Sequence, residues 1–119
     1  MGIEIMKRIE AVVPSARIER AFAALKELDL GGITYFESKG RGEIPRQKVQ
    51  SGRGTSTYTP EFNVNSTIVV VVSDSMANKV IDKILESTSS GLQGEGKIFV
   101  SSIDDVVDVG TKKRGESAL

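Results

Sequence analysis

The 119-residue sequence predicts an α+β fold, a ferredoxin-like βαββαβ sandwich formed by one domain over residues 1–119. Three observations predict it. Four short segments have strand-like apolar patterns, and two longer segments carry apolar residues at helical spacing. The order along the chain is strand, helix, strand, long loop, strand, helix, strand. This order gives two βαβ units on an antiparallel sheet.

The first predicted strand covers residues 6–13, in which Ile9, Ala11 and Val13 on one face alternate with Arg8, Glu10 and Val12 on the other. We expect Ser15 to cap the helix that follows, because a serine hydroxyl accepts a hydrogen bond from a free N–H of the first turn. The apolar stripe of this helix consists of Ile18, Phe22, Leu25 and Leu28. Gly31 and Gly32 end the helix, and residues 33–38, rich in Thr, Tyr and Phe, form the second predicted strand.

The segment from Gly40 to about Glu61 has almost no apolar periodicity and is rich in Gly, Arg, Ser and Thr. Loops of this length are uncommon in compact domains and are often functional, so we interpret it as the moving part of the protein. The third predicted strand, residues 65–73, contains an apolar run at 68–72 and is therefore apolar on both faces. Helices would cover one face, and a second copy of the chain is a candidate cover for the other.

Asp74 or Ser75 is expected to cap the second predicted helix. Its buried stripe should consist of Met76, Val80, Ile81, Ile84 and Leu85. A glycine-rich turn at residues 91–97 then leads into the fourth predicted strand, residues 98–100, and a polar tail at residues 107–119 completes the chain.

The composition excludes several classes of function. Sixteen basic and sixteen acidic residues cancel, so no overall positive charge favours a nucleic-acid partner or an anionic membrane. The absence of both cysteine and histidine removes the most common metal ligands and the most common general base. No segment has the length of a membrane span or the pattern of a signal peptide. We therefore expect a cytoplasmic protein without direct membrane insertion.

The turn Gly94-Glu95-Gly96-Lys97 carries the clearest chemistry in the sequence. Glycines allow backbone N–H groups to converge, and the lysine adds one mobile positive charge. This combination favours binding of an anion such as phosphate. Glycine-rich turns also enter strands for steric reasons alone, so a purely structural role is the alternative.

Three segments resemble the PII family of nitrogen-regulatory signalling proteins: the opening residues 6–11, the turn Lys39-Gly40-Arg41-Gly42, and the run from Gly94 to Val100. The resemblance extends from Met6 to Leu119 apart from the long loop. It implies a homotrimer that binds ATP or ADP, with magnesium, in clefts between adjacent subunits. The nucleotide-binding positions that it implies are Thr34, Gly40, Gly42, Gly94, Glu95, Gly96 and Lys97. It also implies that the long loop changes shape with the ligand and thereby engages an ammonium transporter or an enzyme of nitrogen metabolism.

The sequence departs from the family in its tail. The family usually has two arginines that reach the phosphates from the neighbouring subunit, and these positions align with Asp108 and Gly110. A carboxylate near a polyphosphate repels it. Lys112, Lys113 and Arg114 are candidate replacements for the phosphate contacts, although a basic cluster in a tail is usually solvated surface.

Further departures lie in and after the long loop. The family's Arg-Gln-Lys motif, which helps to hold magnesium and 2-oxoglutarate, reappears after an insertion and makes Gln47 the candidate effector or metal ligand. The lysine that pairs with the 2-oxoglutarate carboxylate aligns with Asn65, which has no charge, and an acid near the adenosine aligns with Val69. Gly52 replaces the tyrosine that some members carry for uridylylation. These departures argue against 2-oxoglutarate binding and against that modification.

We therefore predict a PII-type signal-transduction protein, not an enzyme, that senses adenine nucleotide and regulates nitrogen-metabolism targets through its long loop. The alternative is a PII-like protein whose cleft binds another nucleotide or a small anion, which the missing arginines favour. An enzyme on the same sheet, such as a small phosphatase, would have to work without His or Cys. A purely structural role for both glycine turns would leave Lys97 unexplained.

Overall fold

The alternating pattern of the first strand directs every second side chain toward the helices. In β1 (Met6–Pro14), Ile9 and Ala11 are fully buried and Val13 nearly so, while the residues between them are half-buried. This burial pattern confirms the predicted first strand.

The structure is a computed structural model that describes residues 5–40, 49–50, 57–58, 63–91 and 96–119.

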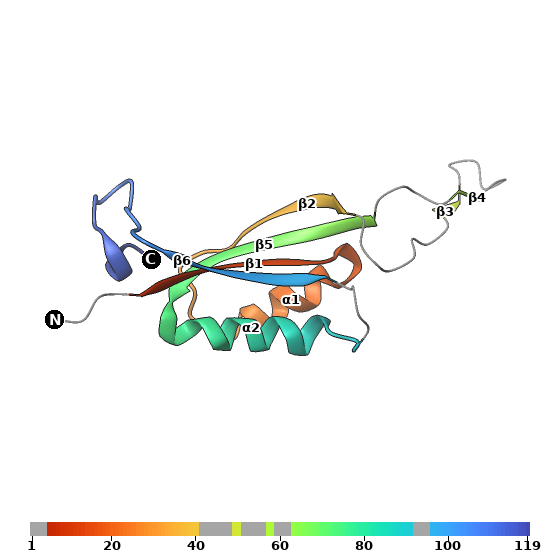
Figure 1. Cartoon of the computed structure of the whole chain (residues 1–119), viewed down its shortest axis with the longest axis horizontal. Helices are drawn as coiled ribbons and strands as arrows, with labels where there is room; N and C mark the ends of the chain where they lie inside the picture. Colours follow the sequence, from red (N-terminus) through yellow and green to blue (C-terminus); the bar gives the residue numbers. More distant parts are fainter. Residues whose placement is uncertain (1–4, 41–48, 51–56, 59–62, 92–95) are drawn as a thin grey trace.

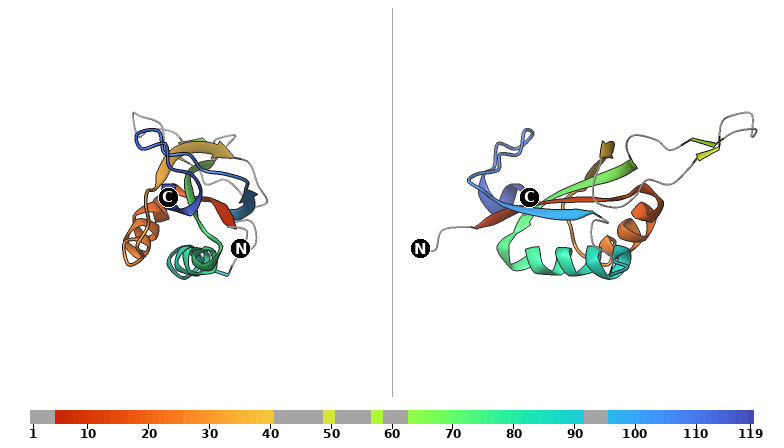
Figure 2. Two further views of the ribbon diagram at one scale, coloured as in Figure 1. Left: turned by 90° about the vertical axis from the view of Figure 1, so that its left-hand side faces the viewer. Right: turned by 45° about the vertical axis from the view of Figure 1, so that its right-hand side comes forward.

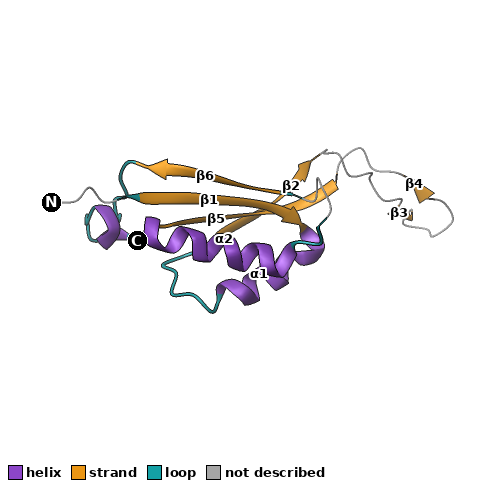
Figure 3. Ribbon diagram, turned by 60° about the horizontal axis from the view of Figure 1, so that its bottom comes forward, coloured by secondary structure: helices purple, strands orange, loops and turns teal. Residues whose placement is uncertain are grey.

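Four strands form one antiparallel sheet, and two helices cover one of its faces (Figures 1 and 3). The order across the sheet is β2 (Thr34–Gly40), β5 (Asn63–Ser73), β1 and β6 (Lys97–Ile103). The helices are α1 (Ile18–Leu25) and α2 (Asp74–Thr88). Strand order and connectivity confirm the predicted ferredoxin-like βαββαβ fold.

The core lies between this sheet and the two helices. β5 contributes Ile68, Val70 and Val72, and α2 contributes Val80 and Ile84, all at most 5 % exposed. Full burial of one such side chain stabilises the fold by about 1.5–3 kcal/mol. The predicted stripe of α2 is wrong at one position, because Leu85 is 46 % exposed. Ala77 and Thr88 are buried on this helix instead.

Both predicted helix caps are wrong. Ser15 lies in the 3₁₀ turn Ser15–Arg17, and its hydroxyl shares a 3.0 Å hydrogen bond with the hydroxyl of Ser66 on β5. Arg17 is therefore the N-cap of α1, without a side-chain cap. At α2 the N-cap is Ser73, and the N–H of Asp74 donates to the backbone carbonyl of Ile5, 2.9 Å away. The Ser15 hydroxyl and the Asp74 N–H thus bond to partners distant in sequence instead of forming local caps.

The first helix is also shorter than predicted, since α1 ends at Leu25. Leu28 and Leu30 are still partly buried against the core. Beyond them, Gly31 lies so close to the last residue that a Cβ there would be 2.8 Å from the backbone carbon of Leu119. A close approach of the C-terminal segment, in addition to the end of the helix, therefore requires a glycine at this position.

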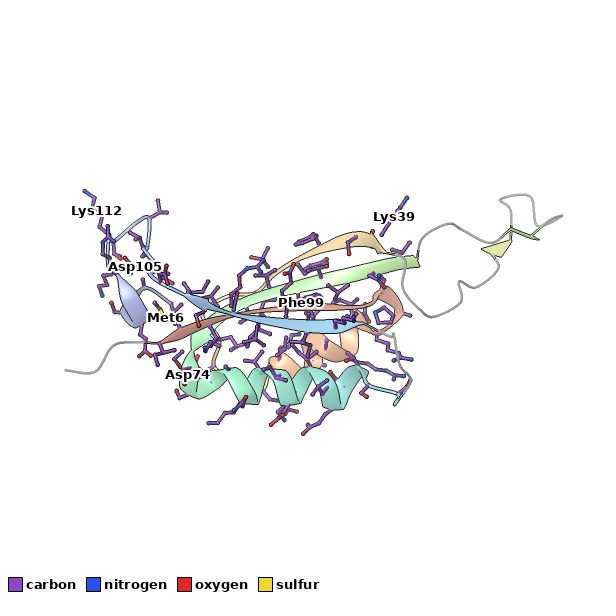
Figure 4. All side chains as sticks on the ribbon, viewed as in Figure 1. Met6, Lys39, Asp74, Phe99, Asp105 and Lys112 are labelled. Atoms are coloured by element: carbon purple, nitrogen blue, oxygen red, sulfur yellow. The ribbon has the colours of Figure 1, made fainter. Side chains whose placement is uncertain are left out.

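Neither α-helix lies on the second face of the sheet (Figure 2, left). Phe36 is 48 % exposed and Phe99 is 53 % exposed on this helix-free face, and Val69 and Val71 lie half-buried between them. Figure 4 shows Phe99 on its edge strand. The prediction that the third strand is apolar on both faces is confirmed.

The long loop and the tail both contain structure that the sequence pattern did not predict. β3 (Val49–Gln50) and β4 (Thr57–Tyr58) pair with each other inside the loop, apart from the main sheet. In the tail, residues 105–115 form a hairpin, here called the tail hairpin, and the 3₁₀ helix Gly115–Ala118 follows it. Neither α1 nor α2, the two α-helices of the described chain, has the length and apolarity of a membrane-crossing helix.

Candidate functional site

The predicted anion turn ends where β6 begins. Lys97 is the first residue of this edge strand, is exposed, and is paired with Val12 of β1. Its ammonium group has no hydrogen bond or ion pair with any residue that the structure describes. Within this part of the chain, Lys97 therefore presents an unneutralised positive charge at the end of the sheet.

Gly96 has a steric role that the sequence pattern does not reveal. Its φ is +145°, and a Cβ on this residue would lie 2.1 Å from the carbonyl oxygen of Val12. Only a residue without a side chain allows β1 and the start of β6 to approach so closely. Gly96 therefore has a structural role, whereas nothing in the packing of the described residues requires the lysine next to it.

The root of the long loop brings together two other predicted positions. Gly40 ends β2, and a Cβ there would lie 2.9 Å from the side-chain nitrogen of Asn65. The uncharged amide that replaces the family's lysine therefore lies directly over this glycine. Thr34 begins the same strand, exposed and paired with Val69.

The fold does not bring the two glycine turns together within one chain. Gly40 lies on β2 and Lys97 on β6, which are the opposite edges of the sheet. The two edges are three strand spacings of about 4.8 Å, or about 14 Å, apart. Lys97 is also level with Phe36, four residues before Gly40 along β2, so the two residues are farther apart than the edges. Four further predicted residues, Gly42, Gln47, Gly94 and Glu95, lie outside the described residues.

The two positions that depart most from the family form a tight turn in the tail hairpin. The Asp108 carboxylate accepts a hydrogen bond from the N–H of Thr111 at 2.8 Å, and its backbone carbonyl accepts one from Lys112. Together with Gly110 inside the turn, these bonds explain the local sequence. The Thr111 N–H, with a further contribution from its hydroxyl, holds the pKa of Asp108 below its ordinary value of 3.8.

The predicted cations of the tail are not equivalent. The Arg114 guanidinium lies 2.5 Å from the Asp105 carboxylate, and this hydrogen bond holds the pKa of Asp105 below its ordinary value. Arg114 is therefore already paired across the tail hairpin. Lys112 and Lys113 are exposed, and Lys112 adopts a φ of +64° in the turn.

The tail cations also lie far from Lys97 of the same chain. β6 has seven residues, so its two ends are about 20 Å apart, and the tail follows its far end. Figure 4 shows Lys112 and Lys39, which lies near the end of β2, toward opposite ends of the sheet. Lys112 and Lys113 could meet an anion held at Lys97 only if they came from another copy.

One cavity adjoins the glycine turn on the helix side. It has a volume of about 260 Å³ and lies between the C-terminal half of α2 and the neighbouring ends of β1 and β6. Its walls are mostly apolar and include Ile81, Ile84 and Leu85, with Gly96 and Lys97 at one end. The described residues contain no group of three His, Cys, Asp or Glu side chains placed to hold a metal ion.

Comparison with known proteins identifies the family of this chain. The family profile described as Nitrogen regulatory protein P-II matches residues 6–113. Proteins named Nitrogen regulatory protein P-II from Bradyrhizobium diazoefficiens and Rhizobium meliloti are 35 % and 36 % identical over 116 residues, which is 96 % of this chain and the whole of each relative. The relative from Mesorhizobium japonicum is 37 % identical over the same length.

Solved structures agree with this assignment. The crystal structure of Arabidopsis thaliana PII bound to citrate superposes with a TM-score of 0.75 at 29 % identity, covering 97 % of this chain and 92 % of that one. The B. subtilis GlnK–ATP complex has a TM-score of 0.73 at 22 % identity, covering 97 % and 96 %, and supports the fold. The full-length sequence match and the shared fold together show that the chain belongs to the nitrogen regulatory protein P-II family.

Proposed function

We propose that this protein is a homotrimeric signal-transduction protein that binds adenine nucleotide, ATP or ADP, at Lys97 in clefts between copies. The nucleotide would act on the long loop, which would engage an ammonium transporter or a nitrogen-metabolism enzyme in the cytoplasm. The observation that carries this proposal is the ammonium group of Lys97 at the end of an edge strand, unpaired among the described residues. A cation without a carboxylate partner, next to a glycine turn, is suited to a phosphate group.

The separation of the predicted site residues supports a cleft between copies. Thr34 and Gly40 lie on one edge strand, Lys97 lies on the opposite edge, and the tail lysines lie at the far end of the sheet. Within one chain, the predicted positions that the structure describes therefore do not line one common pocket. Assembly around the helix-free face would place the edge of one copy beside the next, and it would also cover Phe36 and Phe99.

The charges of the tail hairpin favour a second candidate ligand, a nucleoside monophosphate. Asp108 is ionised in its turn, and Arg114 is paired with Asp105, so residues 105–115 offer only Lys112 and Lys113 as unpaired cations. Fewer positive charges favour a ligand with fewer phosphate charges, such as a nucleoside monophosphate. Nothing in either proposal requires catalysis, and we expect the protein to bind its ligand without turnover.

Isothermal titration calorimetry distinguishes these ligands. We would titrate the intact protein with ATP, ADP, AMP and 2-oxoglutarate, with and without magnesium, and repeat each titration with Lys97→Ala. The proposal predicts nucleotide binding that weakens at least about 10-fold without the ammonium group, because a charge-assisted hydrogen bond contributes about 1.5–3 kcal/mol. Lys83→Ala is the matched control, since this lysine lies on α2, paired with Glu27.

The outcomes separate the hypotheses. Binding of ATP or ADP that depends on Lys97 supports the nucleotide sensor, and preference for AMP supports the altered cleft. Nucleotide affinity that is equal in Lys97→Ala and in the parent protein would refute the assigned contact. Nucleotide hydrolysis at a physiological rate, without any effect on the rate of proteolysis of the long loop, would indicate an enzyme instead.

A further inference from the structure

One ion pair lies in the middle of the helix-free face. Nη1 of Arg8 and Oε2 of Glu10 are 3.0 Å apart, and the two side chains are 37 % and 29 % exposed. The strand register pairs Arg8 with Val71 of β5 and places Glu10 between Val69 and Phe99. Apolar side chains flank Glu10 on both sides, and Val71 and Ser101 flank Arg8, on a face that neither α-helix covers.

We propose that the Arg8–Glu10 ion pair lies inside the contact between copies and determines whether they assemble. This inference rests on the homotrimer proposed above. Covering a face removes its side chains from water, and a charge removed from water must be paired. Arg8 and Glu10 neutralise each other within one chain, so a second chain can cover the face without leaving an unpaired charge.

The chemistry of the face favours a second copy of this chain as the occupant. Its central charges cancel, so it offers no net charge that would attract an acidic or a basic partner. Phe36 and Phe99 are each about half exposed near its two edges, and Val69 and Val71 lie between them. Such a face suits an equally apolar and equally neutral surface, which an identical chain supplies.

Sedimentation velocity on single and double variants tests the inference. The molar mass of the parent protein determined from sedimentation should be three times the 12.8 kDa of one chain. In Arg8→Met the carboxylate loses its partner, and in Glu10→Gln the guanidinium loses its partner. Each single variant should raise the dissociation constant of the assembly at least about 100-fold, because breaking a covered ion pair leaves one charge without compensation.

Restoring neutrality should restore assembly. The double variant Arg8→Met/Glu10→Leu should assemble as well as the parent protein or better, since apolar replacement of a covered pair is often neutral or stabilising. The charge-swapped variant Arg8→Glu/Glu10→Arg should also assemble. Thermal unfolding of each variant at low concentration provides the control for folding.

Like-charged variants show whether each face must be neutral. A chain with Arg8→Glu has two acidic side chains on the face, and a chain with Glu10→Arg has two basic ones. Neither chain should assemble by itself, because copies with the same unpaired charge would meet. Assembly of either chain alone as readily as the parent protein would overturn the inference.

A second ion pair provides the comparison outside the contact. Lys83 of α2 binds Glu27 on the helix side of the molecule, so Lys83→Met should leave the assembly unchanged. If Arg8→Met is equally harmless, the Arg8–Glu10 pair lies outside the contact and the inference is wrong. A parent protein that sediments as a monomer would refute the homotrimer itself, a result distinct from an assembled protein that is insensitive to this pair.

Discussion

Replacement of Gly96 by alanine tests the packing of the glycine turn most sharply. The new Cβ would lie 2.1 Å from the carbonyl oxygen of Val12 and 3.2 Å from its carbon. These are backbone atoms, so no change of side-chain rotamer can relieve the contact. The residue would also retain a φ of +145°, which side chains rarely tolerate.

The expected loss of stability has two contributions. An unfavourable backbone conformation costs about 1–3 kcal/mol. Relief of the clash requires β6 to move away from β1 near the Val12–Lys97 pair, which weakens backbone hydrogen bonds of about 0.5–1.5 kcal/mol each. Gly96→Ala should therefore lower the free energy of unfolding by about 2–5 kcal/mol, a large share of the stability of a small domain.

Urea unfolding followed by circular dichroism, at one fixed protein concentration, measures this loss. Two glycines serve as graded controls. Gly91 has a φ of +85°, but a Cβ there would have no described atom within 4 Å, so its alanine variant should lose only about 1–2 kcal/mol from the backbone conformation. Gly32 has neither constraint, and Gly32→Ala should be close to neutral.

The order of the three variants decides the outcome. The packing predicts the smallest loss for Gly32→Ala, an intermediate loss for Gly91→Ala and the largest for Gly96→Ala. If Gly96→Ala were no less stable than Gly91→Ala, the close approach of β1 and β6 at Val12 would be refuted. A glycine at position 96 would then be required only for ligand binding and not for packing.

Three further predictions concern the helices, the tail and the helix-free face. Arg17→Met should lower the free energy of unfolding by about 1 kcal/mol in urea titrations, because Nη1 of Arg17 donates to the Thr88 carbonyl at the C-terminus of α2, 2.6 Å away. The lowered pKa of Asp108 means that its contribution to the tail hairpin is present above pH 3.8 and is lost as the pH falls through the lower folded value. The protection factor of the Thr111 amide, which is the intrinsic exchange rate divided by the rate observed by NMR, should therefore fall on acidification, and in Asp108→Ala it should be low at every pH. Phe99→Lys should dissociate the proposed homotrimer in sedimentation experiments, and an unchanged sedimentation coefficient would remove this face from the contact.

The sequence predicted the order of the elements because its apolar periodicities are strong and local. Alternation in residues 6–13 and helical spacing around Val80 and Ile84 identify buried faces without reference to the rest of the chain. The caps could not be predicted in the same way. The hydroxyl of Ser15 bonds to Ser66, 51 residues away, and only the folded chain brings them together.

At the candidate site, too, the features that depend on neighbours in sequence could be predicted, and those that depend on contacts distant in sequence could not. The exposed Lys97 followed from its place after a glycine turn, but the steric need for Gly96 depends on the register of β1 with β6. The turn at Asp108 did have a local signal, since an aspartate followed two residues later by a glycine is common in tight turns. The alignment with the family's two arginines predicts only the loss of positive charge at Asp108 and Gly110. It does not predict the tight turn that these two residues form.

A structure determined with bound ATP or ADP tests the central claim most directly. The proposal predicts a phosphate oxygen within about 3 Å of the Lys97 ammonium nitrogen, the usual distance of a charge-assisted hydrogen bond. It also predicts that a second copy of the chain closes the cleft around the nucleotide. A nucleotide bound entirely within one chain, or a Lys97 side chain directed into solvent away from every phosphate, would contradict it.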